Sequence, residues 1–268
     1  MSATEKLKRD SAFNKFQNIF LPWLDILAIA AWGVMMLKYW LTGKLYLLIH
    51  PDYFWLVIVA GFAFLGISGF KALELIGQLF KRKKNAAPQL PTVAHLSLFP
   101  PGLGSGLLLL SAILGLLITP QVFASQTALD RGITESLTTT RAQPQSFRPA
   151  SNPEDRTLID WVRTLNVYPE PDAYTGQKVK VQGFVIHPPN LPDQYFTIAR
   201  FILTCCAADA YPVGLPVKLP QSRTAYPPDT WLEIEGQMIT ENLQDKRQLT
   251  IEATALKKIP KPKNPYDY

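Results

Sequence analysis

The sequence predicts a two-part protein, with an α-helical membrane domain of three spans followed by an all-β domain that folds as a small OB-like barrel. Almost all the long apolar runs lie before residue 125. Beyond residue 176 apolar and polar residues alternate with a period of two, which indicates strands. Between these parts, residues 125–153 are rich in Thr, Ser, Gln and Pro and read as a linker. We therefore expect a membrane domain at 1–124, a polar linker at 125–153 and a β domain at 154–268.

The three spans are expected at about 20–41, 53–76 and 103–123. Each run has the length of about 20 largely apolar residues that a helix needs to cross a bilayer core of ~30 Å. Trp23, Trp40 and Trp55 lie at the edges of the runs, where aromatic residues meet the membrane interface. A cleaved signal peptide fits the first run poorly, because the run is long and contains Asp25. A lipid bilayer is therefore the expected environment of this half.

Basic residues in the short loops predict the orientation of the spans, since they favour the cytoplasmic side. The first loop carries only Lys44. The N-terminal arm and the second loop are more basic, with Lys6, Lys8, Arg9 and Lys15 in the arm and Lys81, Arg82, Lys83 and Lys84 in the loop. The N-terminus is therefore expected inside the cell. An odd number of spans then places the β domain outside the cytoplasm.

Two charged residues, Asp25 and Lys71, lie toward the interior of the first two spans. An ionisable group there costs roughly 2.5–3.5 kcal/mol and indicates a functional role. The first helix runs outward to Trp40 and the second returns inward from Trp55, so both charges fall at a similar depth. We predict an Asp25–Lys71 ion pair between the helices. The alternative is that Asp25 lies among the head groups while Lys71 reaches water beside Glu74.

The expected β domain begins with a short helix at about 153–165. Five strands follow at 178–186, 195–203, 213–219, 231–239 and 248–256. Gly183 and Gly236 lie inside two of them, at positions suited to bends. Five short strands favour a Greek-key barrel like the OB-fold, and an open sandwich is the alternative.

Nucleic acid is excluded as a partner by the distribution of charge. The net charge is +6, yet residues 154–268 hold 13 Lys and Arg against 14 Asp and Glu. The excess base flanks the spans, so the β domain lacks the basic groove that nucleic acid requires. The sequence also shows no paired carboxylates, no Ser/His/Asp pattern and no Gly-rich phosphate loop. We therefore expect no catalytic residues and no enzyme.

The cysteines of the chain are the adjacent pair Cys205 and Cys206. In a continuous strand the two side chains would point to opposite faces, with Cys205 on the apolar one. If the chain leaves strand geometry there, Cys205, Cys206 and Asp209 could hold a metal ion such as zinc, with His187 brought near by the barrel. A vicinal disulfide or redox pair, and packed thiols without chemistry, remain open. His50 and His95, at span edges, are explained by interfacial packing.

Four stretches of the chain together resemble the YcgQ-like family of bacterial membrane permease subunits. They are Gly43-Lys44-Leu45 with Ile49-His50-Pro51, Gly176 to Val185, Ala199-Arg200-Phe201 with Cys205-Cys206-Ala207-Ala208-Asp209-Ala210, and Thr230 to Gly236. The resemblance covers nearly the whole chain, and the Cys-Cys-Ala-Ala-Asp block is its most specific part. It implies a multi-span YcgR-type permease as partner, the bacterial inner membrane as location and a cargo related to zinc. It implies no catalytic residues.

The sequence therefore favours an accessory subunit of a membrane permease, whose outer β domain contacts substrate or partner and whose cargo is a metal ion. A stand-alone, membrane-anchored protein that handles thiols or metals is the alternative. The two differ in whether a multi-span partner co-purifies.

Overall fold

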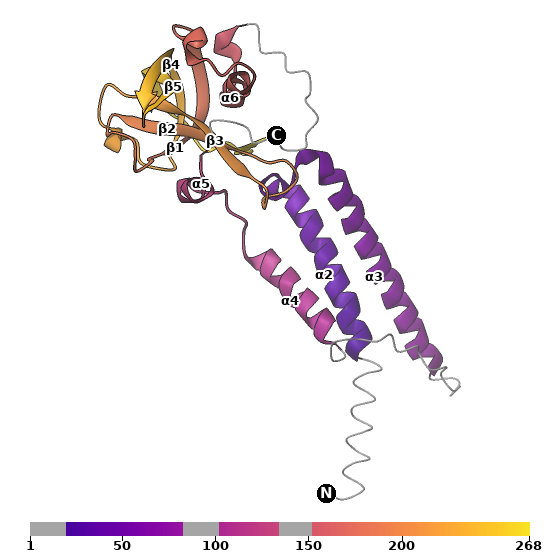
Figure 1. Cartoon of the computed structure of the whole chain (residues 1–268). Coiled ribbons are helices and arrows are strands. Elements are labelled where there is room, and N and C mark those ends of the chain that lie inside the picture. The colour runs from indigo at the N-terminus through magenta and orange to yellow at the C-terminus, as the bar shows by residue number, and fades with distance from the viewer. Residues whose placement is uncertain (1–19, 83–101, 134–151) are drawn as a thin grey trace, which may run out of the picture. The chain divides into compact units, whose positions relative to one another are not determined.

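The computed structural model describes residues 20–82, 102–133 and 152–268, which fall into two compact units (Figure 1). The first unit contains the long helices and extends to Pro120. The second contains the strands, begins at Gln121 and also takes in the short segment Tyr46–His50. The basic N-terminal arm, Lys83, Lys84, His95 and most of the expected linker lie outside the described residues.

The first unit consists of α2 (Leu21–Leu41), α3 (Phe54–Arg82) and α4 (Leu103–Leu117), with a 3-10 turn η3 (Pro51–Tyr53) before α3. Small residues allow α2 and α3 to approach closely, because a Cβ atom on Gly33 would lie 3.0 Å from the carbonyl oxygen of Gly61. Helix α4 is joined to α2 by hydrogen bonds as well as packing. Trp32 Nε1 donates to the Leu108 carbonyl at 2.9 Å, and Lys38 Nζ donates to the Leu116 carbonyl at 3.0 Å.

Two segments of this unit, Leu21–Leu41 and Pro51–Gln78, are long and apolar enough to cross a membrane. Helix α4 is shorter than the expected third span, because it has 15 residues and ends at Leu117. Ile118 is extended, and Pro120 follows two positions later. At 1.5 Å per residue α4 covers about 22 Å, less than a bilayer core of ~30 Å. Among the described residues two segments are therefore long enough to span a membrane, and the third span stays a prediction.

The two charged residues of the expected ion pair lie on different helices of this unit, Asp25 on α2 and Lys71 on α3. The hydroxyl group of Ser105, on α4, donates a hydrogen bond to Asp25 Oδ1. This contact supplies a polar partner for the Asp25 carboxylate within the apolar unit. The Asp25–Lys71 ion pair stays a prediction.

Two α-helices of the second unit precede its strands. Residues 125–131, within the range expected as a linker, form α5 (Ser125–Arg131). The expected helix from 153 is divided into a 3-10 turn η4 (Pro153–Asp155) and α6 (Leu158–Val167). The division follows from a capping box, in which Thr157 Oγ1 accepts from the Asp160 amide while the Asp160 side chain accepts from the Thr157 amide. The second part of the expected helix therefore starts after Thr157.

A six-stranded mixed sheet forms the rest of this unit. Its strands are β1 (Lys178–Ile186), β2 (Tyr195–Ile202), β3 (Tyr211–Lys218), β4 (Trp231–Leu243), β5 (Lys246–Lys258) and β6 (Tyr266–Asp267). The order is β1-β4-β5-β3-β2-β6, and β1 also pairs with β2. The first five strands are therefore linked in a ring of pairings, in which the β3–β5 pair is parallel and the others are antiparallel. All five strands predicted from the alternating pattern are present.

The core of this unit lies among the strands and α6, where Trp161, Phe196 and Ile234 are fully buried. Gly236 allows β4 and β5 to approach at a β-bulge, where the register shifts between Glu235 and Gly236. A Cβ atom at Gly236 would lie 2.1 Å from the Glu252 carbonyl oxygen. A side chain there would thus force the strands apart, which explains the glycine within an otherwise regular strand.

Fusion reporters test the number of spans. We expect a reporter that works only outside the cytoplasm to be active when fused after Tyr268 and silent when fused after Arg82. This result requires three crossings, with the chain around α4 supplying the third. If only α2 and α3 cross the membrane, the reporter after Tyr268 will be silent as well. The prediction that the second unit lies outside the cytoplasm will then be wrong.

Candidate metal site at the cysteine pair

The cysteine pair lies in the loop that joins β2 to β3. Strand β2 ends at Ile202, so the chain leaves strand geometry before it reaches the pair. Cys205 is exposed and Cys206 is half-buried, and both are free thiols. The expectation that Cys205 points into an apolar face is therefore wrong, because that expectation required the strand to continue through the pair.

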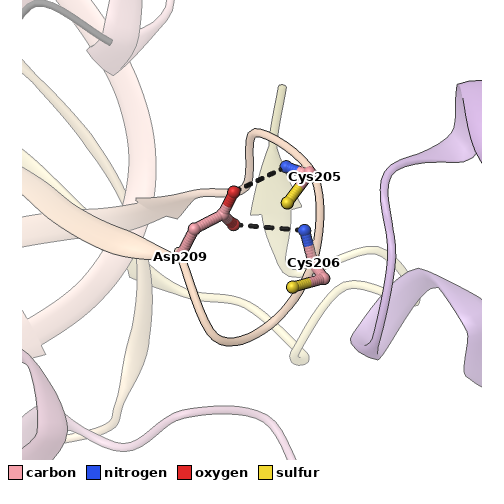
Figure 2. Close-up of side chains that lie close together, drawn as sticks. All are labelled: Cys205, Cys206 and Asp209. Carbon is pink, nitrogen blue, oxygen red and sulfur yellow. Dashed lines mark hydrogen bonds between the residues drawn. The ribbon is translucent and has the colours of Figure 1, made fainter.

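Asp209 closes the loop around the pair (Figure 2). Its carboxylate accepts hydrogen bonds from the backbone amides of Cys205, at 2.8 Å, and Cys206, at 3.2 Å. The hydroxyl group of Thr204 also donates to it. The Asp209 amide returns a hydrogen bond to the Cys206 carbonyl at 3.1 Å. One side chain thus satisfies the backbone donors of a turn that neither strand can pair.

The same loop gathers three potential metal ligands. The Sγ atoms of Cys205 and Cys206 and a carboxylate oxygen of Asp209 all lie within 4.8 Å of one another. Around a tetrahedral zinc ion with bonds of about 2.0–2.3 Å, ligand atoms lie roughly 3.3–3.8 Å apart. A small closure of the loop would therefore be enough to place all three on one ion. The structure brings together the three residues that the sequence predicted as ligands.

The electrostatics of the loop keep the Cys205 thiol protonated. Its hydrogen bond to the Asp209 carboxylate raises the pKa of Cys205 to about 12, with smaller contributions from Cys206 and burial. Burial alone would raise the pKa of Asp209, but hydrogen bonds from Cys205, Thr204 and the two amides outweigh it and lower that pKa. The carboxylate is thus ionised at neutral pH. A metal ion would have to displace the thiol proton, as metals do at cysteine sites.

A segment far away in the sequence, Tyr46–His50, pairs with this loop. Ile49 forms an antiparallel β-bridge with Cys206. The His50 amide donates to the Cys205 carbonyl at 2.9 Å, and the Ala207 amide donates to the Leu48 carbonyl at 2.8 Å. Sequence reasoning missed this pairing. The available signal was the Ile49-His50-Pro51 stretch, which belongs to the same resemblance as the cysteine pair.

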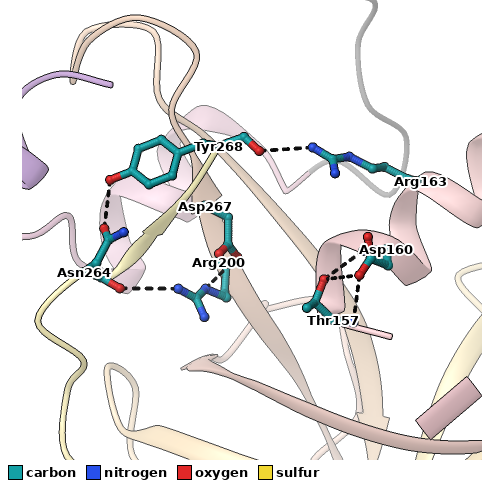
Figure 3. Close-up of polar contacts among 7 residues, drawn as sticks. All are labelled: Thr157, Asp160, Arg163, Arg200, Asn264, Asp267 and Tyr268. Atoms are coloured by element: carbon teal, nitrogen blue, oxygen red, sulfur yellow. Dashed lines mark hydrogen bonds and ion pairs between the residues drawn. The ribbon is translucent and has the colours of Figure 1, made fainter. Parts of the chain in front are cut away.

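A polar cluster anchors the end of β2 just before the loop (Figure 3). Strand β6 runs parallel to β2, and the Leu203 amide donates to the Asp267 carbonyl at 2.9 Å. Arg200 Nε forms an ion pair with Asp267 Oδ2 at 2.8 Å. Burial raises the pKa of Asp267, which the positive charges of Arg200 and Arg163 partly offset. The strand end that leads into the cysteine loop is thereby fixed by a half-buried ion pair.

Tyr268 extends this cluster to the bridging segment. Its hydroxyl group donates to Asn264 Oδ1 at 2.9 Å, and Arg163 donates to its main-chain oxygen at 3.1 Å (Figure 3). Burial raises the pKa of Tyr268 to about 12. The phenol ring packs edge-on against the His50 imidazole, with ring centroids 4.8 Å apart. The His50 side chain therefore packs beside the loop while its backbone pairs with Cys205.

His187, considered from the sequence as a further ligand, lies elsewhere. It follows the end of β1, and its Nε2 atom hydrogen-bonds to the Tyr226 carbonyl at 2.9 Å. Burial lowers the pKa of His187. Within the described part of the chain, the group of potential metal ligands consists of Cys205, Cys206 and Asp209, without His187.

A separate cavity of about 420 Å³ opens on the second unit, away from the cysteines. Its polar lining is uncharged. The lining residues are Leu129, Ile133, Pro188, Pro189, Asn190, Leu191, Thr197, Gly214, Pro216, Gln244 and Gln248. Cys205, Cys206 and Asp209 are not among these lining residues, so the cavity is separate from the candidate metal site.

The comparison with protein families concerns the part of the chain that carries the cysteine loop. Residues 152–268 match the DUF1980 C-terminal domain. DUF1980 denotes a domain of unknown function, and the match is consistent with the YcgQ-like resemblance without deciding it. No curated protein matches the chain. The DUF1980-like region includes all of the strands and the three potential ligands, so the candidate site lies within a recognised domain.

The raised pKa of Cys205 predicts slow alkylation despite its exposure. In a Cys206→Ser background, Cys205 should react slowly with iodoacetamide at pH 8, because the neutral thiol is a poor nucleophile. Adding Asp209→Asn should speed the reaction, since removal of the carboxylate charge lowers the pKa of Cys205. The rate is measured by mass spectrometry, with Asp193→Asn as control. Equal rates in the Asp209→Asn variant and its parent would contradict the described electrostatics.

Proposed function

We propose that this chain is an accessory subunit of a bacterial membrane permease complex, and that its DUF1980-like domain binds the cargo, a zinc ion, outside the cytoplasm. The observation that carries the proposal is the gathering of two thiols and one carboxylate within 4.8 Å in a surface loop. Thiolate ligands favour zinc and other soft metals over magnesium or calcium. The ligand types therefore point to the chemical class of the cargo.

The exposure of the site supports a role in metal transfer. Structural zinc sites are usually closed by four protein ligands, whereas three ligands leave a position open. Cys205 is exposed at the surface of the loop. An incoming or receiving ligand can therefore reach a bound ion. Such access suits a protein that passes a metal on.

The OB-like barrel is part of the proposal. The ring of pairings β1-β2-β3-β5-β4, closed by the β1–β4 pair, supports a small five-stranded Greek-key barrel. In this arrangement the cysteine loop is the β2–β3 connection at one end of two neighbouring strands. The barrel would act as a rigid support for the loop.

Exposed apolar side chains on the long helices support a membrane environment and a membrane partner. On α3, Phe62, Phe70 and Leu73 are 59%, 70% and 71% exposed. Contiguous apolar surface of this kind is covered in membrane proteins by lipid or by other helices. A multi-span permease subunit would supply such helices. The same surface would face lipid alone in a stand-alone protein that handles metals or thiols.

Purification from native membranes under mild detergent tests the function. We expect a tagged chain to bring down a multi-span membrane protein and about one zinc ion per chain, measured by mass spectrometry of proteins and metals. The Cys205→Ser/Cys206→Ser double variant should keep the partner and lose the zinc, because it removes both soft ligands. His187→Gln, whose imidazole lies outside the cluster, serves as the matched control and should keep both.

Each arm of this experiment has a contrary outcome. A fully purified chain that brings down no multi-span protein would overturn the permease assignment in favour of the stand-alone protein. Zinc retained by the double variant would place the metal elsewhere. A native protein whose cysteine pair is fully oxidised would replace metal binding with disulfide chemistry.

A further inference from the structure

His50 lies directly opposite Cys205 in the antiparallel pairing between the 46–50 segment and the cysteine loop. The bridge joins Ile49 to Cys206. Because antiparallel partners run in opposite directions, the next pair is His50 with Cys205, and the hydrogen bond from His50 N to the Cys205 carbonyl at 2.9 Å confirms that register. Residues directly opposite each other share a face, with Cβ atoms about 4.5–5.5 Å apart.

The His50 imidazole is therefore placed to exchange its contact with Tyr268 for a contact with Cys205. In the structure it packs against Tyr268, with centroids 4.8 Å apart and planes at 79°. A change of side-chain rotamer would turn the ring toward Cys205 without moving the backbone that carries it. Such rotamer changes are fast compared with backbone rearrangement.

Cys205, Cys206 and Asp209 would leave one position of a tetrahedral zinc ion open, and an imidazole suits that position. Zinc sites with four protein ligands use combinations of cysteine, histidine and carboxylate. Two thiolates and a carboxylate already carry three negative charges against the two positive charges of the ion. A neutral imidazole completes the tetrahedron without adding to that excess. A fourth anionic ligand would increase it.

We propose that His50 is an exchangeable fourth ligand of the metal site, which turns from Tyr268 onto an ion held by Cys205, Cys206 and Asp209 and gives up that position to an incoming or receiving ligand. This inference rests on the proposed function. Pro51, the residue after His50, begins the 3-10 turn that leads into α3. A bound ion would then fix the connection between α2 and α3 to the loop through a side chain as well as the backbone.

Zinc competition with a chromophoric chelator, on the full chain in detergent micelles, tests the proposal. His50→Ala and His50→Phe should each weaken zinc binding by at least about tenfold, the lower range for removing even an indirect ligand contact. The phenylalanine variant keeps an aromatic ring to pack against Tyr268, so it separates the loss of the nitrogen from the loss of packing. His187→Gln is the control and should bind as the parent does.

Cobalt(II) substitution supplies a second readout. The parent should show the strong visible absorption of a four-coordinate cobalt site, and both His50 variants should show a changed spectrum. Zinc affinity within twofold of the parent in His50→Phe, with an unchanged cobalt spectrum, would overturn the role of His50. In that case loss of zinc in the Cys205→Ser/Cys206→Ser variant would still support the proposed site. Unchanged zinc binding in all of these variants would reject both.

Discussion

The candidate site depends on the hydrogen bonds that the Asp209 carboxylate accepts from the amides of Cys205 and Cys206. Adjacent cysteines in a strand face opposite ways, and one ion could not then contact both thiols. By satisfying the two amides, Asp209 stabilises a turn in which the thiols and its own oxygen lie within 4.8 Å. The residue that shapes the loop is thus also one of its potential ligands. An ion at this place would compete with the thiol proton for the carboxylate.

Long-range contacts hold this loop from two sides. The β-bridge from Ile49 to Cys206 pairs it with the connection between α2 and α3. The ion pair between Arg200 and Asp267 fixes the end of the preceding strand. Backbone pairing of this kind limits how far the loop can open.

Patterns among neighbouring residues predicted those features of the structure that local interactions determine. The period-two alternation located the five long strands of the β unit, because each strand buries one face. The identity of Cys205, Cys206 and Asp209 as potential ligands also followed from their closeness in the chain. The exposure of Cys205 was not predicted, since it depends on where β2 ends. The pairing of Ile49 with Cys206 joins segments far apart in sequence, and no periodicity signals such a contact. The early end of α4 at Leu117 likewise reflects local backbone geometry that mean hydropathy does not detect.

Zinc binding by the loop through both cysteines can be measured directly. X-ray absorption at the zinc edge of the full chain, loaded with one equivalent of zinc, measures the ligands directly. We expect two sulfur atoms at about 2.3 Å and two lighter atoms at about 2.0–2.2 Å around the zinc. A zinc ion surrounded by oxygen and nitrogen alone would contradict binding through the cysteines.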